Sequence, residues 1–196
     1  MKIFYSDASP YSTKVRMAAL HAGLPAESVA VDTNADPAEL LAANPLGKIP
    51  TLLTDEGVAV YDSRAIMNYI DRQTRGALYP RNAAKRTEVD VLEATADGIC
   101  DSLLAIVYER RLRPEEKIHQ PWIDRQWQKV ERALDHLEAN MPRLGKKPNA
   151  GHFALAAALR YLELRFAGKW QRGRPKLKRY LARFEAVFPG YAQFKE

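Results

Sequence analysis

Cysteine is nearly absent from this chain, because Cys100 is the single thiol among its 196 residues. One cysteine excludes an internal disulfide, a CxxC redox pair and a thiolate-rich zinc site. The four histidines do not show the spacing of metal ligands, so we expect no metal and assign them surface or helix-capping positions. We expect Cys100 itself to be a buried small side chain. Any sulfur chemistry therefore depends on a second molecule that supplies the thiol.

Long apolar runs are also missing, and none approaches the ~20 residues that a helix needs to cross a bilayer. Residues 1–5 are followed at once by Asp7 and a turn, which is unlike a secretory signal peptide. We therefore expect a cytoplasmic protein without membrane contact. Hydrophobic residues make up 46% and charged residues 28% of the chain, which is the balance of an ordinary globular protein.

The chain also lacks an excess of acidic residues, since its net charge is +6. Residues 1–80 hold seven Lys or Arg against nine Asp or Glu, so the positive excess lies in the remainder. The basic segment, residues 160–183, holds nine basic residues and one acid, Glu163. No aromatic residue suited to base stacking interrupts its run from Arg172 to Arg179. We interpret the segment as a solvated helix face and do not favour nucleic acid as a partner, although attraction of an acidic co-substrate remains an alternative.

The first 78 residues alternate strand-like and helix-like segments. Ser9 and Pro10 are typical of an N-cap and a first helical position, and Gly23 is typical of a helix end. The predicted elements are strands at 2–5, 28–31, 51–53 and 58–61, a helix from Pro10 to Gly23, a short helix after Asp36-Pro37 that stops before Asn44, and a helix that is capped by Ser63 and ends at Gly76. This βαβ, α, ββα order is that of a thioredoxin-like domain, which we place at residues 1–78.

From Asn82 onward the apolar residues recur with helical periodicity only. Residues 89–106 carry one long apolar stripe, and further helices are predicted at 123–137, from Asn149, and from Pro175 through Leu181. The sequence thus predicts an α/β plus all-α fold, in which a helical bundle at residues 82–196 follows the thioredoxin-like domain.

Three short motifs give the first half a family resemblance. They are Ser9-Pro10-Tyr11, the loop Asn44-Pro45-Leu46-Gly47-Lys48-Ile49-Pro50, and Asp62-Ser63-Arg64. In this order and spacing they resemble the glutathione S-transferase family, in the bacterial type that carries serine at the thiol-activating position. The resemblance implies a soluble two-domain enzyme that binds glutathione as co-substrate and stabilises its thiolate for attack on an electrophilic small molecule, as in detoxification.

Ser9 is the predicted catalytic residue. A free thiol has a pKa of about 8.5, and lowering it by about two units requires roughly 2.7 kcal/mol of preferential stabilisation of the anion. A hydroxyl that donates to the thiolate contributes ~1.5–3 kcal/mol, and a helix N-terminus adds ~0.3–2 kcal/mol. Ser9, at the start of the first helix, supplies both effects. The alternative interpretation is that Ser9 only caps the helix.

The other two motifs supply the predicted glutathione-binding residues. Ile49-Pro50 precedes a strand and is a candidate for the cis peptide bond of thioredoxin-like folds. The resemblance implies that the Ile49 backbone pairs with the cysteinyl part of glutathione like an added strand, and that Lys48 meets a glutathione carboxylate. Ser63 would bind the γ-glutamyl carboxylate at a helix N-terminus, and Asp62 would accept from the γ-glutamyl ammonium. Helix capping is the alternative for Asp62 and Ser63.

The second substrate and the partner are less defined. Tyr11, Tyr108 and Arg111 are candidates for a co-substrate pocket opposite Ser9, within the space that the helical domain would line. Serine rather than cysteine at position 9 disfavours mixed-disulfide chemistry and leaves transferase, isomerase, reductase or peroxidase activity open. The resemblance also implies a homodimer, with the third helix of the first half against the long helix of a partner.

The helical half resembles the family mainly by layout and leaves alternatives open. The family usually opens its core helix with a Ser/Thr-x-x-Asp capping box, whereas this chain has Asn149-Ala150-Gly151-His152, and a neutral His152 is expected to be a poorer capping partner than Asp. The basic segment permits a different class of function, a non-catalytic protein that keeps the fold and docks a protein or RNA. Salt-dependent RNA binding would favour that function.

Overall fold

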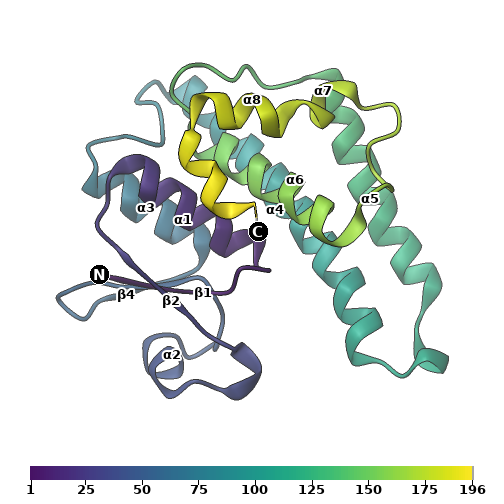
Figure 1. Cartoon of the computed structure of the whole chain (residues 1–196), viewed down its shortest axis with the longest axis horizontal. Coiled ribbons are helices and arrows are strands. Elements are labelled where there is room, and N and C mark those ends of the chain that lie inside the picture. Colours follow the sequence, from purple (N-terminus) through teal and green to yellow (C-terminus); the bar gives the residue numbers. More distant parts are fainter. Residues whose placement is uncertain (196) are drawn as a thin grey trace.

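In the computed structural model, which describes residues 1–195, the N-terminal half forms a four-stranded sheet (Figure 1). The strands are β1 (Lys2–Tyr5), β2 (Glu27–Ala30), β3 (Thr51–Leu53) and β4 (Ala59–Val60), in the order β2-β1-β3-β4. β1 pairs in parallel with β2 and antiparallel with β3, where Ile3 lies opposite Leu52. β4 is antiparallel to β3. The predicted thioredoxin-like order is confirmed.

Three helices cover this sheet. α1 (Pro10–Ala22) and α3 (Ser63–Gln73) lie on one face, and α2 (Ala38–Ala43) lies on the other (Figure 1). Ile3 belongs to the buried cluster of Val15 in α1 and Ile66 in α3. Successive side chains of a strand point to opposite faces, so the neighbouring Phe4, also fully buried, lies on the α2 side. The sheet is therefore buried on both faces.

The C-terminal half is helical in the part that the structure describes. Its elements are α4 (Ala83–Leu112), α5 (Gln120–Ala139), α6 (Ala150–Phe166), α7 (Pro175–Lys178), α8 (Tyr180–Val187) and the 3-10 turns η2 (Glu115–Lys117) and η3 (Pro189–Phe194). α6 contacts α4, α1 and α8 (Figure 1), and nearly all of its side chains are buried. A Cβ on Gly151 would lie 2.8 Å from the Leu92 side chain, so glycine permits the close approach of α6 to α4. The predicted fold class, α/β plus all-α, is confirmed.

Some boundaries differ from the prediction. β2 begins one residue earlier than predicted, and an unpredicted 3-10 turn, η1 (Thr33–Ala35), follows it. Asp62 rather than Ser63 is the N-cap of α3, because its carboxylate accepts the Arg64 N–H at 2.9 Å. The predicted helix from Pro175 through Leu181 is two helices, α7 and α8, because the chain turns at Arg179, whose N–H bonds back to carbonyls of α7.

α6 begins with a complete capping box in which histidine takes the place of the acid. The Asn149 side chain accepts the His152 N–H at 3.1 Å, and Nδ1 of His152 accepts the Asn149 N–H at 3.1 Å. Burial lowers the pKa of His152 to about 4, against the opposing effect of a hydrogen bond with the Arg143 backbone. The imidazole is therefore neutral, and its Nδ1 accepts one hydrogen bond of the box while the His152 backbone N–H donates the other.

We predict that this cap makes the fold sensitive to acid. The pKa of His152 is about 4 in the folded chain and about 6.5 in an unfolded one, so the unfolded state takes up a proton first as the pH falls. The contribution to stability is full above about pH 6.5, and roughly 2–3 kcal/mol of it is lost by about pH 4.5. Urea unfolding at pH 7 and 4.5, compared with His152→Asp, measures this loss. An equal acid loss in the Asp variant would contradict the prediction.

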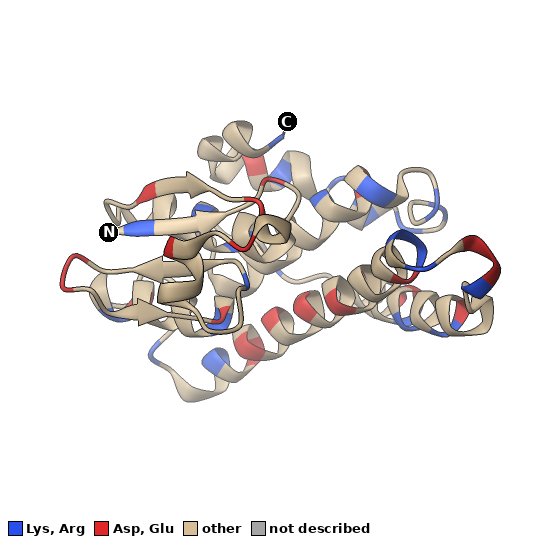
Figure 2. Cartoon of the chain, turned by 90° about the horizontal axis from the view of Figure 1, so that it is seen from below, with Lys and Arg blue, Asp and Glu red and all other residues tan. Residues whose placement is uncertain are grey.

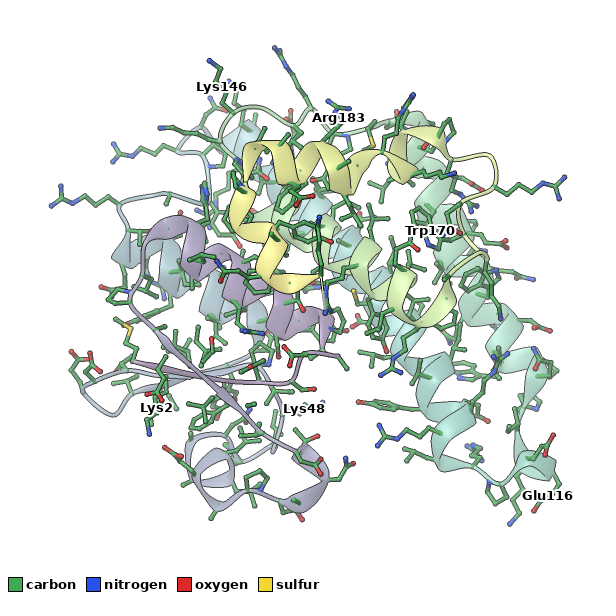
Figure 3. All side chains as sticks on the ribbon, viewed as in Figure 1. Lys2, Lys48, Glu116, Lys146, Trp170 and Arg183 are labelled. Atoms are coloured by element: carbon green, nitrogen blue, oxygen red, sulfur yellow. The ribbon has the colours of Figure 1, made fainter. Side chains whose placement is uncertain are left out.

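Part of the basic segment is structural, which corrects its interpretation as a solvated face. Arg160 and Arg174 are each only 8% exposed. Arg174 donates to the Trp170 carbonyl at 2.7 Å and pairs with Asp135 at 2.6 Å. The other basic residues of the segment are exposed, and Arg183 points outward at the end of the molecule opposite to Lys48 (Figure 3). No helix in residues 1–195 is long and apolar enough to span a membrane.

A buried ionic cluster joins the two halves of the chain. Lys14 of α1 is 1% exposed, and its Nζ lies 3.0 Å from Glu93 and 2.9 Å from Asp97. The Tyr79 hydroxyl donates to Glu93 at 2.6 Å, and Nε of Arg64 donates to Asp97 at 3.0 Å. Both carboxylates belong to the acidic residues that recur along α4 (Figure 2). Two cations therefore neutralise two buried carboxylates where α1 and α3 meet α4.

Candidate active site

Ser9 is the N-cap of α1, in the loop that follows β1. Its Oγ accepts the N–H of Ser12 at 3.2 Å, and its own N–H donates to the Ser6 carbonyl at 3.0 Å. A hydroxyl has one proton and two lone pairs, so the capping bond occupies a lone pair and leaves the proton available. Capping and donation to a thiolate are therefore compatible at Ser9, which also lies at the positive end of the α1 dipole.

The loop before β3 presents the backbone of Ile49. The Ile49–Pro50 peptide bond is cis, as predicted. Asn44 holds the loop, since its amide nitrogen donates to the Lys48 carbonyl at 2.9 Å and to Thr51 Oγ1 at 3.0 Å. Within residues 1–195 the Ile49 N–H and C=O take part in no hydrogen bond of the protein. Since backbone groups are obligatory donors and acceptors, Ile49 offers one of each to an extended ligand.

Asp62 and Ser63 lie at the N-terminus of α3. The Asp62 carboxylate is exposed and uses Oδ1 to cap the helix, which leaves Oδ2 open to a cation. Ser63 is buried as the first residue of the helix, where backbone N–H groups have no intrahelical partner. The helix end thus combines a carboxylate with N–H donors, which is the complement of an amino-acid zwitterion.

Tyr11, one of the candidates for the co-substrate pocket, also holds α1 against α4. Its hydroxyl donates to the carboxylate of Asp101 in α4. Burial, followed by this hydrogen bond, raises the pKa of Tyr11. The hydroxyl is therefore protonated at all ordinary pH values and ties the first turn of α1 to α4, so that only the ring is left for contact with a substrate.

Two of the other candidates, Tyr108 and Arg111, lie on α4, whereas Lys48 lies in the loop before β3. Tyr108 is 50% exposed on the C-terminal part of α4. The pKa of Asp32, in the connection between β2 and α2, is lowered by hydrogen bonds from Asn34 and further by the charge of Arg111. The end of α4 therefore lies across from this connection. Lys48 is exposed and lies on the side of the N-terminal half that is turned toward α4 and α5 (Figure 3).

The protein's own thiol is unsuited to nucleophilic chemistry. Cys100 is buried, as expected, and desolvation together with the charge of Asp97 raises the pKa of its thiol well above the ordinary value. A thiol that stays protonated is a poor nucleophile. Among the residues that the structure describes, no group of His, Cys, Asp and Glu is arranged to hold a metal ion. The chemistry that these residues support is stabilisation of an external thiolate.

Sequence reasoning missed three residues that hold this site in place, namely Lys14, Asp101 and Arg160. Lys14 did give a signal, because a charge three positions after Tyr11 on the apolar face of α1 requires a buried partner. Asp101 and Arg160 gave none, since each reaches α1 or the loop before it only through tertiary packing. A cavity of about 460 Å³ beside Arg160, between α6, α8 and η3, contains none of the predicted site residues.

Both halves of the chain are similar in sequence to known protein families. Residues 8–73 match the family described as glutathione S-transferase, N-terminal domain, and residues 120–183 match the one described as glutathione S-transferase, C-terminal domain. The chain is 35% identical over 183 residues to the uncharacterized GST-like protein YibF of Escherichia coli K12, and the alignment covers 90% of each protein.

Solved structures extend this similarity to the arrangement of the helices and strands. A glutathione S-transferase from Methylobacillus flagellatus KT, with glutathione bound, is 35% identical with a TM-score of 0.88, over 96% of this chain and 97% of that one. A glutathione transferase family member from Pseudomonas fluorescens Pf-5, also with bound glutathione, is 32% identical with a TM-score of 0.82, over 94% and 93%. The likeness therefore includes both halves.

Proposed function

Because the chain belongs to the glutathione S-transferase family, we propose that it binds glutathione and uses Ser9 to stabilise the glutathione thiolate for attack on an electrophilic small molecule. The observation that carries the proposal is the available proton of Ser9 Oγ at the positive end of α1. The glutathione-bound structures of similar proteins support glutathione as the ligand. A hydrogen bond to the sulfur anion contributes ~1.5–3 kcal/mol, enough to ionise much of the bound thiol at neutral pH.

The other groups would hold the tripeptide by its backbone and its ends. Ile49, beside Pro50, would pair with the cysteinyl residue as an added strand. Asp62 would accept from the γ-glutamyl ammonium, while Ser63 and the N–H groups of α3 would donate to the γ-glutamyl carboxylate. Lys48 would meet a glutathione carboxylate. Tyr108, Arg111 and the ring of Tyr11 would line the wall for the electrophile.

Conjugation is the leading reaction, and isomerase, reductase and peroxidase steps use the same activated thiolate. A cytoplasmic site of action and a role in detoxification fit this chemistry, because the cytosol keeps thiols reduced. We also propose a two-fold dimer, in which α3 of one protomer packs on α4 of its partner. Val91, an exposed apolar side chain on α4, supports this surface as the contact.

Calorimetric titration with glutathione tests whether the protein binds this ligand. The variant Asp62→Asn tests the proposed contact between Asp62 and the γ-glutamyl ammonium. Asparagine caps a helix as well as aspartate does, so the variant removes the charge and keeps the fold. We expect its glutathione dissociation constant to rise about tenfold, as for loss of a charged hydrogen bond of ~1.5 kcal/mol. Asp55→Asn, an exposed carboxylate in the turn between β3 and β4, is the matched control. Absence of binding at millimolar glutathione would rule the proposal out.

A second candidate is a non-catalytic docking protein. The exposed part of the basic segment favours it, because Arg183, like the nearby Lys146, points away from the molecule at the end opposite to Lys48 (Figure 3). Binding of RNA that weakens steeply with added salt, in a protein without transferase activity, would favour docking over catalysis.

A further inference from the structure

The loop that leads into Ser9 is fastened to the C-terminal end of the chain. Buried Arg160 of α6 donates through Nη1 to the Asp7 carbonyl at 3.0 Å and through Nε to the Phe194 carbonyl. Arg16 of α1 pairs with the Asp7 carboxylate at 3.1 Å, and its guanidinium carbon lies 5.2 Å from the centroid of the Phe194 ring. These four residues close a ring of contacts that joins α6, η3, α1 and the loop.

This ring acts on the backbone immediately before the predicted catalytic hydroxyl. Asp7 stands two positions before Ser9, and the loop is otherwise tightened by the hydrogen bond from the Ser9 N–H to the Ser6 carbonyl. The guanidinium carbon of Arg16 also lies 3.6 Å from the centroid of the Tyr5 ring, so these contacts fix the end of β1 as well. A catalytic group displaced by about 1 Å can lose on the order of 10²-fold in rate. The placement of the Ser9 hydroxyl therefore depends on this anchoring.

We infer that Arg160 is a positioning residue for Ser9, and that together with η3 it holds residues 6–9 where the Ser9 hydroxyl meets the sulfur of bound glutathione. The inference rests on the proposed function and adds to it a contribution from the last helical turn of the chain. Arg160 acts through the Asp7 carbonyl and not by touching the sulfur. Arginine suits this role because its planar guanidinium donates hydrogen bonds to two carbonyls at fixed angles, whereas lysine has a single ammonium group.

The test compares Arg160→Lys with the wild-type protein and with Arg174→Lys. Arg174 is the matched control, because it is equally buried and also donates to a backbone carbonyl, but it lies in the connection between α6 and α7 and pairs with Asp135. The thiolate absorbance of bound glutathione is titrated with pH, and kcat and KM are measured with chlorodinitrobenzene. In Arg160→Lys we expect the pKa of the bound thiol to rise by about 0.5–1 unit and kcat at pH 6.5 to fall about three- to tenfold, with KM for glutathione changed less than about twofold. In Arg174→Lys we expect lower thermal stability with the thiol pKa unchanged.

The outcomes separate this inference from the function on which it rests. A bound-thiol pKa in Arg160→Lys equal to that of the wild type overturns the inference. If Arg160→Lys does not fold, the same titration is made on Phe194→Leu. This variant removes the phenyl group beside Arg16 and keeps the backbone carbonyl of residue 194. A rise of the thiol pKa in that variant supports the inference, and no rise overturns it. A wild-type protein that leaves the bound thiol at the pKa of free glutathione instead overturns the proposed role of Ser9 itself.

Discussion

Ser9→Ala is expected to lower kcat for glutathione conjugation by about 10–100-fold at pH 6.5, and to change the dissociation constant of glutathione by less than about threefold. The alanine leaves the α1 dipole in place and removes the hydrogen bond to the sulfur. The pKa of the bound thiol should therefore rise by about 1–2 units, toward the value of about 8.5 for a free thiol. Steady-state kinetics and thiolate absorbance measure the two effects.

The pH dependence separates this catalytic role from helix capping. Ser9→Ala also removes a cap that contributes ~1 kcal/mol to stability. A deficit caused by the missing donor narrows above about pH 8.5, where the thiol ionises unaided, whereas a deficit caused by a damaged helix does not. Ser9→Thr keeps both the donor and the cap and serves as the control. A deficit that stays constant between about pH 6.5 and 9 would contradict the role given to Ser9.

Lys14→Met is expected to lower the free energy of unfolding by ~3–5 kcal/mol, because the variant leaves a buried carboxylate without its cation. Glu93 and Asp97 would keep only Arg64, which is itself half exposed and bonded to Asp97. For a chain of this size the melting midpoint should fall by roughly 10 °C. Differential scanning calorimetry and urea unfolding give both quantities.

A surface ion pair of similar length provides the control for Lys14. Lys2 lies 2.8 Å from Glu39, and both side chains are largely exposed. Lys2→Met should therefore lower the free energy of unfolding far less than Lys14→Met does. The double variant Lys14→Met/Glu93→Gln should recover part of the loss, because it removes the carboxylate that has lost its cation. Similar losses in the Lys2 and Lys14 variants would show that burial of the cluster does not determine its contribution.

The fold was predictable where the signals are local. The ends of α1 follow from Ser9-Pro10 and from Gly23, whose positive φ of 69° suits glycine. The cap of α3 was misassigned because Asp62 and Ser63 are both good N-caps, and the sequence does not say which one takes the extended conformation. The break at Arg179 was missed because apolar periodicity continues across it from Leu177 to Leu181.

The candidate site was predictable only in its contacts within short segments. The cis bond before Pro50 followed from the position of the proline ahead of a strand. The hydrogen bond from Tyr11 to Asp101 spans 90 positions of the chain, and that from Arg160 to Asp7 spans 153. Composition could not separate Arg160 from its exposed neighbours, since a buried arginine differs from a solvated one only in what tertiary packing brings to it.

The position of α6 has a consequence for synthesis of the chain. α1 packs against α6, which emerges from the ribosome roughly 130 residues after α1 does, and against η3, which emerges later still. Protein synthesis proceeds at ~5–20 residues per second, so roughly 6–30 s pass between the synthesis of α1 and that of α6. The part of α1 that α6 covers therefore stays exposed while residues 23–149 are synthesised, and the contacts of Arg160 with Asp7 and Phe194 form only after η3 has been made.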